Sequence, residues 1–397
     1  MKKNHKGVGL HLKKALKAIV LLIYKATFGL YICLAYHVRV IRNDMKGIKG
    51  PFLLIGNHVT DYDGCFMQQH AGKPVSFVIN DKAFRSPVLR AILLFFDMIP
   101  KKKFSSDIQA VRRIFRAKER GDIVGVFPEG SRTWDGNTLR IIRSTATLVK
   151  SVRLPVVAAH ISGGATASPR WRDGRQGRGV VEIEYQKLLD ADVIRTMSDE
   201  DIHKIIEQGI RHDEAAFTTS RKISFVRKNR AEGLERFLFI CPECESLCTT
   251  RTHGDEISCA CGMTAVYTEY GTLAGGRFDT LAKWDAWQRS RLASRLADMP
   301  DDEMLFSDHV EVYCARGPGK FRHLADGTAC ISKDSIRIGG DPVLTFNTGD
   351  ISGVNIQNNN IFEFNHGSAC YRLSFPGKAS AYKWEMLYDL HIGCSEI

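Results

Sequence analysis

The chain has 397 residues, which is too long for one ordinary domain, so two or three domains are expected. Its formal net charge is +12, and the excess is unevenly placed. Residues 1–50 carry nine Lys and two Arg against one Asp, a net +10. This basic start indicates an anionic partner, either nucleic acid or phospholipid.

An apolar run of 21 residues, 18–38, favours the phospholipid. The run is long enough to cross a bilayer core of about 30 Å, but Lys25 interrupts it at a cost of roughly 2.5 to 3.5 kcal/mol. Basic residues flank both ends, so the positive-inside rule selects no orientation. We expect residues 1–50 to lie in the cytoplasmic leaflet interface with Lys25 extended toward water. A membrane span and a buried core helix are the alternatives. A secretory signal peptide is not expected, because no small-residue cleavage site follows the run.

Residues 51–220 alternate apolar runs with helical patterns, which predicts an α/β domain with a mixed, mainly parallel sheet covered by helices. The last predicted helix, 198–217, opens with Ser198 as N-cap and an acidic first turn. A strongly basic loop at 168–179 is interpreted as solvated, with contact to headgroups or coenzyme A phosphates as the alternative. The strand candidates are 52–56, 76–79, 122–127, 155–161 and 180–185, and the other helix candidates are 87–96 and 108–120.

Two short motifs follow predicted strands, at the strand ends where α/β folds place their chemistry. The first contains Asn57, His58 and Asp63 in the segment IGNHVTDYDG, and the second is FPEGSR at 127–132. An Asn-His-x4-Asp turn followed by Phe-Pro-Glu-Gly-Ser-Arg resembles the signature of the lysophosphatidic acid acyltransferase family of glycerolipid acyltransferases. The resemblance covers roughly 46–217, a little under half of the chain.

Acyl transfer to an alcohol needs a base, because a hydroxyl is a poor nucleophile at neutral pH. Histidine has a suitable pKa, and the role is assigned to His58. A carboxylate on the second ring nitrogen would hold the tautomer and stabilise the imidazolium; the family pattern puts this on Asp63, and Asp61 is the alternative. The resemblance implies acyl-CoA or acyl carrier protein as donor. It implies a lysophospholipid as acceptor, most plausibly 1-acylglycerol 3-phosphate, which would give phosphatidic acid.

The expected substrate-binding residues come from both motifs and from the segment between them. Arg132 would pair with the acceptor phosphate through its planar guanidinium. Glu129 would orient the acceptor or the loop, and Gly130 would let the backbone approach the substrate and offer oxyanion donors. Where the family usually has an arginine, this chain has three lysines, so the acceptor's identity is left open. The complete set is Asn57, Lys101, Lys102, Lys103, Glu129, Gly130, Ser131 and Arg132.

A charged linker is expected at 221–236, followed by a small zinc ribbon at 237–272. Cys241-x2-Cys244 and Cys259-x-Cys261 stand on two predicted turns of a hairpin, which suits a closed tetrahedral Zn²⁺ site with a structural role. The second pair has one intervening residue where two are usual, so Cys248 is an alternative ligand. Disulfides are the poorer interpretation for a chain on the cytoplasmic side. The remaining six cysteines are expected to be free thiols.

The C-terminal part is predicted to contain an amphipathic helical connector and a β-rich domain. Residues 273–303 form the connector, in which Trp284 and Trp287 are interpreted as packing anchors. Residues 304–397 hold about six short alternating strands and a terminal helix, and this pattern resembles a PH or GRAM-like domain. Such a domain would bind a partner protein or a lipid headgroup.

The sequence thus predicts a peripheral or monotopic O-acyltransferase at the cytoplasmic face of the cell membrane. A remodelling acyltransferase or transacylase with another acceptor is the alternative within the same chemistry. A non-catalytic lipid or protein adaptor is the alternative from another class, although an adaptor has no need of His58, Asp63 and Glu129. A nucleic-acid partner is not expected, because the basic excess lies beside the apolar run and not beside the cysteines.

Overall fold

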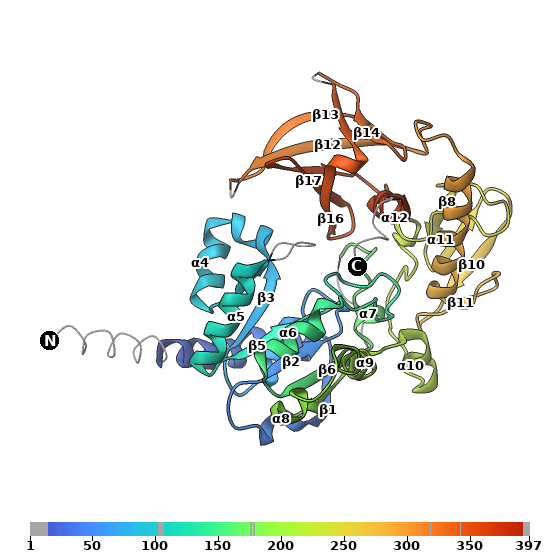
Figure 1. The fold of residues 1–397 in the computed structure, drawn as a ribbon. Coiled ribbons are helices and arrows are strands. Elements are labelled where there is room, and N and C mark those ends of the chain that lie inside the picture. The colour runs from blue at the N-terminus through green and yellow to red at the C-terminus, as the bar shows by residue number, and fades with distance from the viewer. Residues whose placement is uncertain are drawn as a thin grey trace. The chain divides into compact units, whose positions relative to one another are not determined.

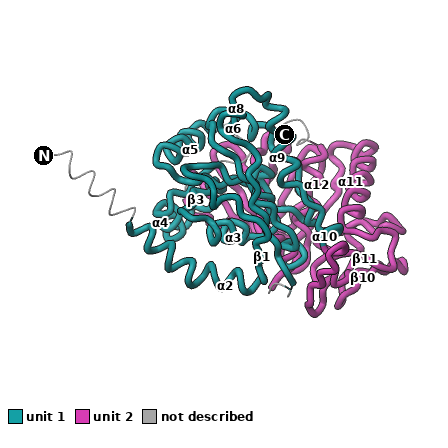
Figure 2. The backbone as a smooth tube through the Cα atoms, turned by 90° about the horizontal axis from the view of Figure 1, so that it is seen from below, with its two compact units in different colours: residues 1–167, 176–217 teal, residues 168–175, 218–397 magenta. Residues whose placement is uncertain are grey.

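The computed structural model describes residues 15–101, 107–174, 177, 179–317, 319–341 and 343–391 (Figure 1). The chain divides into two compact units, and each unit contains two separate stretches of chain (Figure 2). Unit 1 comprises residues 1–167 and 176–217, and unit 2 comprises residues 168–175 and 218–397. The division near residue 217 lies close to the end expected for the acyltransferase domain, whereas the transfer of 168–175 to unit 2 has no counterpart in the sequence patterns.

The N-terminal apolar run is helical from residue 15 to residue 26 and again in α2 (Phe28–Ala35). By length and composition this stretch could cross a membrane: its mean hydropathy is 2.0, and 17% of it is buried. It packs along α3 (Asp63–His70), where the Tyr24 hydroxyl donates a hydrogen bond to the Cys65 carbonyl at 2.9 Å.

The position of the Lys25 side chain differs from the expected one, which was extended toward water. Its ammonium does not extend toward water but donates to the Ala71 carbonyl, 2.6 Å away, just beyond the C-terminal end of α3. A cation there interacts favourably with the carbonyl end of the helix. The outer side of the apolar run is therefore free of this charge. The run also ends earlier than expected, because Val38 begins a strand.

Unit 1 is built on a seven-stranded sheet with the order β1-β7-β6-β2-β5-β3-β4. Neighbouring strands are parallel except for β6 and β7, which confirms the mixed, mainly parallel sheet. All four residues of β2 are buried, as expected of a central strand whose two faces are both covered. The strands are β1 (Val38–Asn43), β2 (Leu53–Gly56), β3 (Val75–Asn80), β4 (Ile99–Lys101), β5 (Ile123–Val126), β6 (Val156–Ser162) and β7 (Val181–Leu189).

The helices of unit 1 have local signals that set their ends. In α5 the Asp107 side chain accepts from the Ala110 amide at 3.0 Å, and Gly121 ends the helix in the left-handed conformation. The predicted helix 198–217 is broken: α9 ends at Ile210, and α10 begins at Glu214. Beyond α3, the described helices of unit 1 that follow the N-terminal stretch are η1 (Asp44–Gly47), η2 (Asp81–Arg85), α4 (Pro87–Phe95), α5 (Ile108–Arg120), α6 (Ser144–Val152), α7 (Gly164–Ala167), α8 (Ala191–Ile194), α9 (Asp199–Ile210) and α10 (Glu214–Ser220).

Unit 2 begins with a four-stranded antiparallel sheet that carries the cysteines. The segment expected as a charged linker is buried in its second half, where Leu234 and Arg236 lie in the short helix η3 (Leu234–Arg236). The helix α11 (Leu281–Asp298) packs on this sheet's edge: the indole of Trp284 is buried and donates to the Ile240 carbonyl at 2.9 Å. The strands are β8 (Thr250–His253), β9 (Glu256–Cys259), β10 (Thr264–Tyr267) and β11 (Leu273–Ala274).

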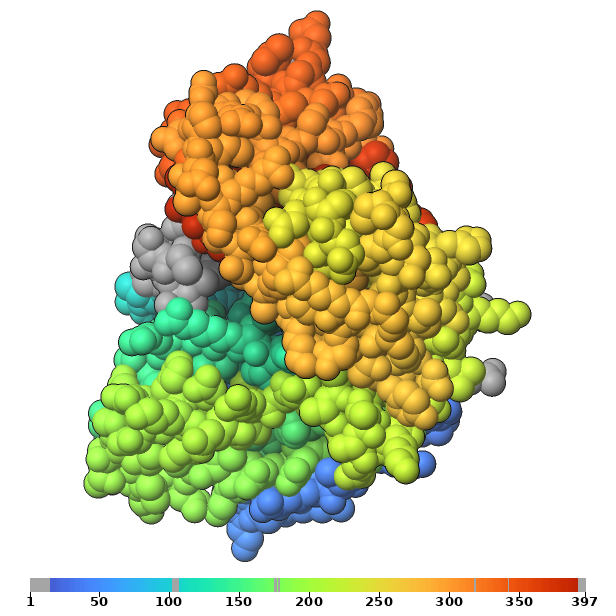
Figure 3. Space-filling model, turned by 90° about the vertical axis from the view of Figure 1, so that its right-hand side faces the viewer, coloured from blue at the N-terminus to red at the C-terminus, as the bar shows by residue number. Residues whose placement is uncertain are grey.

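The C-terminal part of unit 2 is a seven-stranded antiparallel sheet with the order β15-β14-β13-β12-β18-β17-β16, closed by one helix. This β-rich make-up agrees with the PH or GRAM-like expectation, with one strand more than the pattern indicated. Within unit 2 the four-stranded sheet β8–β11 and the helix α11 form one continuous surface in the space-filling view (Figure 3). The elements are β12 (Phe306–Arg316), β13 (Arg322–Ile331), β14 (Ser335–Ile338), β15 (Leu344–Asn347), η4 (Thr348–Asp350), β16 (Ile351–Gln357), β17 (Ile361–His366), β18 (Ala369–Ser374) and α12 (Ala381–His391).

The basic loop also differs from expectation, because its first part is buried within unit 2. The Arg170 guanidinium donates to the Ile356 carbonyl at 2.9 Å, and the Trp171 ring is 1% exposed. Arg175 and Arg178 lie outside the described residues. The first part of this loop, up to Trp171, therefore contributes to packing, whereas Asp173 and Gly174 are exposed.

Candidate active site

The two motifs meet at one edge of the sheet, beyond the C-terminal ends of β2 and β5. These strands are parallel neighbours with Ile55 opposite Val126, so the segments that follow them emerge side by side. Backbone bonds then join the segments: the His58 amide donates to the Glu129 carboxylate at 2.7 Å, and the Thr133 amide donates to the His58 carbonyl at 3.0 Å. The local structure thus holds His58 against the second motif.

His58 and Asp63 form a fixed pair. The Nδ1 atom of His58 lies 2.8 Å from Oδ2 of Asp63. Asp63 is fully buried and also accepts the amides of Val59 and Thr60 at 2.7 and 2.9 Å and the Thr60 hydroxyl at 2.7 Å. A carboxylate held by so many donors keeps its position. Since Asp63 occupies Nδ1, Nε2 is the ring nitrogen that remains for proton transfer.

Aromatic stacking restricts the imidazole further. The His58 ring stacks on Phe127 at 4.5 Å between centroids, and Phe127 stacks on Phe77 at 6.0 Å. Phe77 in turn lies over Gly125, where an added Cβ would approach the ring to 2.3 Å. Phe77 and Gly125 were not singled out from the sequence; they lie in ordinary strand patterns, and the stack exists because β3 and β5 are neighbours.

The structure separates the two aspartates that the sequence left open. Asp61 does not contact the imidazole in the described geometry; its carboxylate pairs with Nη1 of Arg132 at 2.5 Å. The Arg132 side chain is 10% exposed, whereas the Asp61 side chain is 71% exposed. Arg132 is therefore largely buried, and its partner Asp61 lies at the surface.

Glu129 has a supporting position. It is buried, and its two carboxylate oxygens accept the amides of His58 at 2.7 Å and of Leu139 at 2.6 Å. Burial raises its pKa to about 8, although the two backbone donors act in the opposite direction. Glu129 thus joins the first motif to the loop that follows Arg132. This geometry agrees with the loop-orienting role among the two expected for it.

Asn57, Gly130 and Ser131 lie at the same strand ends. Asn57 is fully buried, and its amide exchanges two hydrogen bonds with the Ile161 backbone of β6 at 2.7 and 2.8 Å. Its side chain anchors the turn before His58, and its expected substrate-binding role stays a prediction. Gly130 has φ +68°, which a residue with a side chain seldom adopts, and Ser131 is half-buried.

Lys101 is on the same edge of the sheet but is not next to His58. It ends β4, in register with Asn80 of β3, and both β3 and β5 separate β4 from β2. At about 4.8 Å per strand, this places its backbone roughly 14 Å to the side. Lys102 and Lys103 lie outside the described residues.

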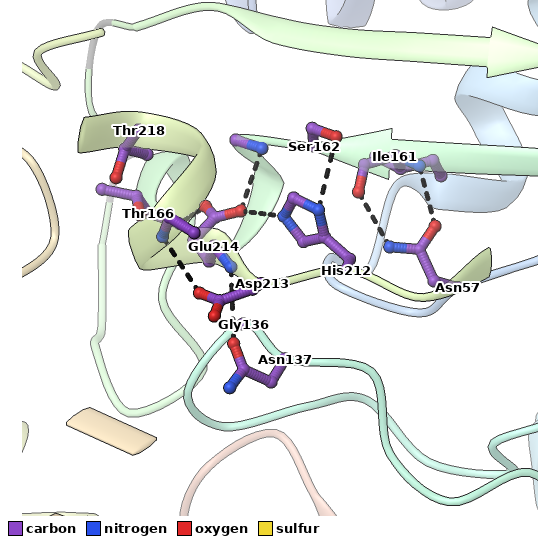
Figure 4. A network of polar contacts seen from close by, with 12 residues as sticks. Asn57, Gly136, Asn137, Ile161, Ser162, Thr166, His212, Asp213, Glu214 and Thr218 are labelled. Carbon is purple, nitrogen blue, oxygen red and sulfur yellow. Dashed lines mark hydrogen bonds and ion pairs between the residues drawn. The ribbon is translucent and has the colours of Figure 1, made fainter. Parts of the chain in front are cut away.

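A buried polar network that the sequence did not suggest lies at the end of β6 (Figure 4). Nε2 of His212 is 2.7 Å from Oε2 of Glu214, which also accepts the Gly163 amide at 2.9 Å. Burial alone would raise the pKa of Glu214, but the contact with His212 and the hydrogen bonds from Thr166 together lower it below its usual value. The His212 backbone exchanges hydrogen bonds with Thr138, at 2.8 Å to the hydroxyl and 3.2 Å from the amide.

The network pins the loop that follows Arg132 to the end of β6. Asn137 contributes as well, because its side-chain oxygen accepts the Glu214 amide at 3.4 Å. The break between α9 and α10 places His212 and Glu214 in this cluster. No periodicity in the sequence marks the break. A His-x-Glu after an amphipathic helix is the one local signal that could have drawn attention to it.

The four cysteines predicted as metal ligands come together in unit 2. Their sulfur atoms all lie within 4.8 Å of one another. The sulfur atoms of Cys241 and Cys261 are 3.6 Å apart, and those of Cys244 and Cys259 are 3.8 Å apart. Four thiolates at about 2.3 Å from a tetrahedral Zn²⁺ would have separations close to these values, so the site fits zinc. Cys248 lies outside the cluster, with its sulfur 3.4 Å from the Lys383 ammonium.

Comparisons with known proteins point to one family. A family model described as "Acyltransferase" matches residues 37–162. The chain is 22% identical over 174 residues to the chloroplastic 1-acyl-sn-glycerol-3-phosphate acyltransferase BAT2 of Brassica napus, covering 42% of this chain and 50% of that protein. It is 22% identical over 159 residues to the chloroplastic LPAT1 of Arabidopsis thaliana, covering 40% and 44%. The chain thus spans about half the length of the curated relatives it matches.

A solved structure is also similar in part. The crystal structure of the 1-acyl-sn-glycerophosphate acyltransferase PlsC from Thermotoga maritima matches with a TM-score of 0.45 and 17% sequence identity, over 56% of this chain and 90% of that chain.

The fold and the site together define an α/β domain with a histidine and aspartate pair at the strand ends, and the matched residues 37–162 contain both motifs. Residues 37–162 of this domain match the acyltransferase family model. The chain is also similar to two 1-acyl-sn-glycerol-3-phosphate acyltransferases, so the resemblance drawn from the two motifs is confirmed at this level.

Proposed function

We propose that the protein transfers a fatty acyl group from acyl-CoA or acyl carrier protein to the free hydroxyl of a lysophospholipid. The acceptor that suits the site best is 1-acylglycerol 3-phosphate, and the product is then phosphatidic acid. The observation that carries the proposal is the His58 and Asp63 pair, held at 2.8 Å beside the buried guanidinium of Arg132.

In this mechanism Nε2 of His58 takes the proton of the acceptor hydroxyl as its oxygen attacks the thioester carbonyl. Asp63 stabilises the imidazolium that forms, because its fixed carboxylate accepts the Nδ1 proton. Collapse of the tetrahedral intermediate breaks the carbon–sulfur bond, and the imidazolium returns the proton to the leaving thiolate. Backbone amides near Gly130 are the proposed donors to the oxyanion.

Arg132 supplies the binding site for the acceptor's phosphate. A guanidinium offers two parallel hydrogen bonds to a phosphate and binds it better than it binds an exposed carboxylate. The phosphate would replace Asp61, whose side chain is 71% exposed and pays little to move aside. Arg132 lies in the loop that begins beside His58, so the phosphate and the reacting hydroxyl of a small glycerol unit can be bound together.

The lipid substrates require contact with a membrane. The helical stretch 15–35 is the proposed anchor, lying at the cytoplasmic face in a peripheral or monotopic manner. The cysteine cluster of unit 2 is proposed to hold a structural Zn²⁺, because four thiolates leave no open position for a substrate. The β-rich part of unit 2 is proposed to bind a partner protein or a lipid headgroup.

The test is acyl transfer by purified, zinc-loaded protein on anionic vesicles, with acyl-CoA and acyl carrier protein as alternative donors. Lysophosphatidic acid is compared with lysophospholipids that carry other headgroups. His58→Ala should remove transfer while vesicle binding persists, and His253→Ala, at an exposed histidine of β8, should leave both unchanged. Transfer by His58→Ala at the wild-type rate would exclude the mechanism. No transfer by wild type to any of these acceptors would favour a non-catalytic adaptor.

A further inference from the structure

The helix α4 presents an apolar surface that none of the described residues of the chain buries. None of its nine residues, all of which the structure describes, is buried. Burying a side chain of this kind contributes about 1.5 to 3 kcal/mol relative to leaving it in water, so an exposed row of them indicates a missing contact. The most exposed apolar members and their exposed fractions are Val88 at 72%, Leu89 at 41%, Ile92 at 50% and Leu94 at 46%.

This surface belongs to a well-defined element and is not a frayed loop. Ser86 caps the helix, with its hydroxyl accepting from the Leu89 amide at 3.5 Å, and Pro87 occupies the first turn. The helix is the crossover between β3 and β4, which are parallel neighbours in the sheet of unit 1. Because it starts after the C-terminal end of β3, α4 begins at the sheet edge that carries His58.

A second apolar surface lies next to α4. Asp97, just beyond the end of α4, forms an ion pair with Lys17 of the N-terminal helical stretch. Figures 1 and 2 both show α4 and this stretch on the same side of unit 1. The exposed apolar side chains of the stretch are Leu16, Ile19, Leu22, Ile23, Phe28, Leu30, Tyr31 and Leu34.

The charges near α4 are those of a surface that meets anionic lipid. The segment 81–97 contains Lys82, Arg85 and Arg90 against Asp81 and Asp97, a net charge of +1, and Asp97 is already paired with Lys17. Arg90 is exposed on α4 itself. Apolar side chains beside basic ones bind the boundary between headgroups and acyl chains, where burial of the apolar face and attraction to anionic lipid add together.

We propose that α4 is a second membrane-contacting element, which inserts its exposed apolar face into an anionic phospholipid bilayer beside the stretch 15–35. The inference rests on the proposed function, because it is the lipid nature of the substrates that makes a bilayer the partner. It adds that the protein has two attachment points on the membrane. It also means that the sheet edge with His58 is held at the bilayer surface, where a lysophospholipid need not leave the membrane completely to reach the site.

The experiment measures binding of the full-length protein to vesicles of phosphatidylglycerol and phosphatidylcholine, without substrate. Val88→Asp/Ile92→Asp should weaken binding by tenfold or more, because two carboxylates would have to enter an anionic interface. The matched control is Val193→Asp/Val226→Asp, which makes the same charge change at two exposed valines outside α4. The control should bind within about twofold of wild type. Val88→Ser/Ile92→Ser, which adds no charge, should give an intermediate loss.

Three further readouts separate the explanations. Circular dichroism and thermal melting should be the same for all variants, since the changed side chains are exposed. Acyl transfer between short-chain, water-soluble substrates should be unchanged in the α4 variants if the proposed function holds. An unchanged vesicle affinity of Val88→Asp/Ile92→Asp would overturn the inference, and so would a dimer of wild type that this variant dissociates without loss of vesicle binding. Vesicle binding through α4 by a wild type that transfers no acyl group would contradict the proposed function alone.

Discussion

At the scale of single residues, the decisive contact is the one between Asp63 and His58. The sequence offered two aspartates on the same turn, and local spacing could not rank them. The fold ranks them because α3 begins at Asp63, which buries this carboxylate, whereas Asp61 projects toward solvent and Arg132.

Asp63→Asn should lower kcat by roughly 10²- to 10⁴-fold, the usual range for a component of general base catalysis. The asparagine amide would present a donor where the ring nitrogen and two backbone amides also donate. Asp61→Asn should leave kcat within about fivefold, because an exposed ion pair contributes about 0 to 1 kcal/mol. Steady-state kinetics with both variants checks this, with thermal melting as the control for folding. Equal losses of kcat in the two variants would contradict the assignment.

Glu129 gives a prediction about pH and stability. Burial raises its pKa to about 8, whereas an unfolded glutamate ionises near about 4.3. Between these values the folded chain binds more protons, so the stabilisation is complete below pH ~4.3 and is lost as the pH rises toward 8. Relative to Glu129→Gln, whose amide does not titrate, the wild-type free energy of unfolding should fall by up to about 1.4 kcal/mol per pH unit in this window.

Chemical denaturation of both proteins at several pH values between 5 and 8 measures that difference. The two curves include the same other titrating groups, which therefore cancel in the comparison. Curves that stay parallel across the window would show that Glu129 remains ionised in the folded chain.

At the scale of elements, the strands with continuous apolar runs were predictable, and those without such runs were not. The central strands β2, β5 and β6 are almost entirely buried and are apolar apart from His160 and Ser162 at the end of β6, so the sequence shows them directly. β1 was hidden at the end of the apolar run, and β4 has three residues, one of them Pro100. The antiparallel pairing of β6 and β7 depends on the path between them, which no local pattern encodes.

The proposed zinc site belongs to this scale, because its four cysteines come from two separate stretches of the chain, 241–244 and 259–261. Cys261→Ser should reduce the zinc content of the purified protein well below one per chain and lower the stability of unit 2, since structural zinc contributes directly to folding. Cys248→Ser should retain the metal, because Cys248 lies outside the sulfur cluster. Atomic absorption and thermal melting, with and without a chelator, make the comparison. Loss of zinc in Cys248→Ser would instead assign the fourth ligand to Cys248.

At the scale of the whole molecule, the chain passes between its two units more than once. Residues 168–175 leave unit 1 and pack within unit 2 before the chain returns. Trp171 is central to this packing: its ring stacks on Phe237 at 6.1 Å and meets Tyr267 edge-on at 5.7 Å, and its carbonyl accepts from Arg236 at 2.9 Å.

Trp171→Ala should lower the stability of unit 2 by about 3 to 5 kcal/mol, the usual cost of removing a large buried aromatic side chain. Trp171→Phe should lose less, because it keeps a stacked ring. Limited proteolysis, read out by the fragments that arise within residues 218–397, measures the effect. Wild-type resistance in Trp171→Ala would mean that the segment 168–175 contributes little to unit 2.

The sequence alone determined the features that depend on neighbouring residues: two motifs after apolar strands, a cysteine quartet, and an apolar stretch with basic flanks. Each of these is a short-range pattern with its own chemical meaning. The tertiary structure decided the features that join distant residues. These include the pairing of Asp61 with Arg132, the inward turn of Lys25, the His212 and Glu214 network and the open face of α4. They could not be read from the sequence because burial and partner choice are set by which strands become neighbours, and that choice is made by the fold as a whole.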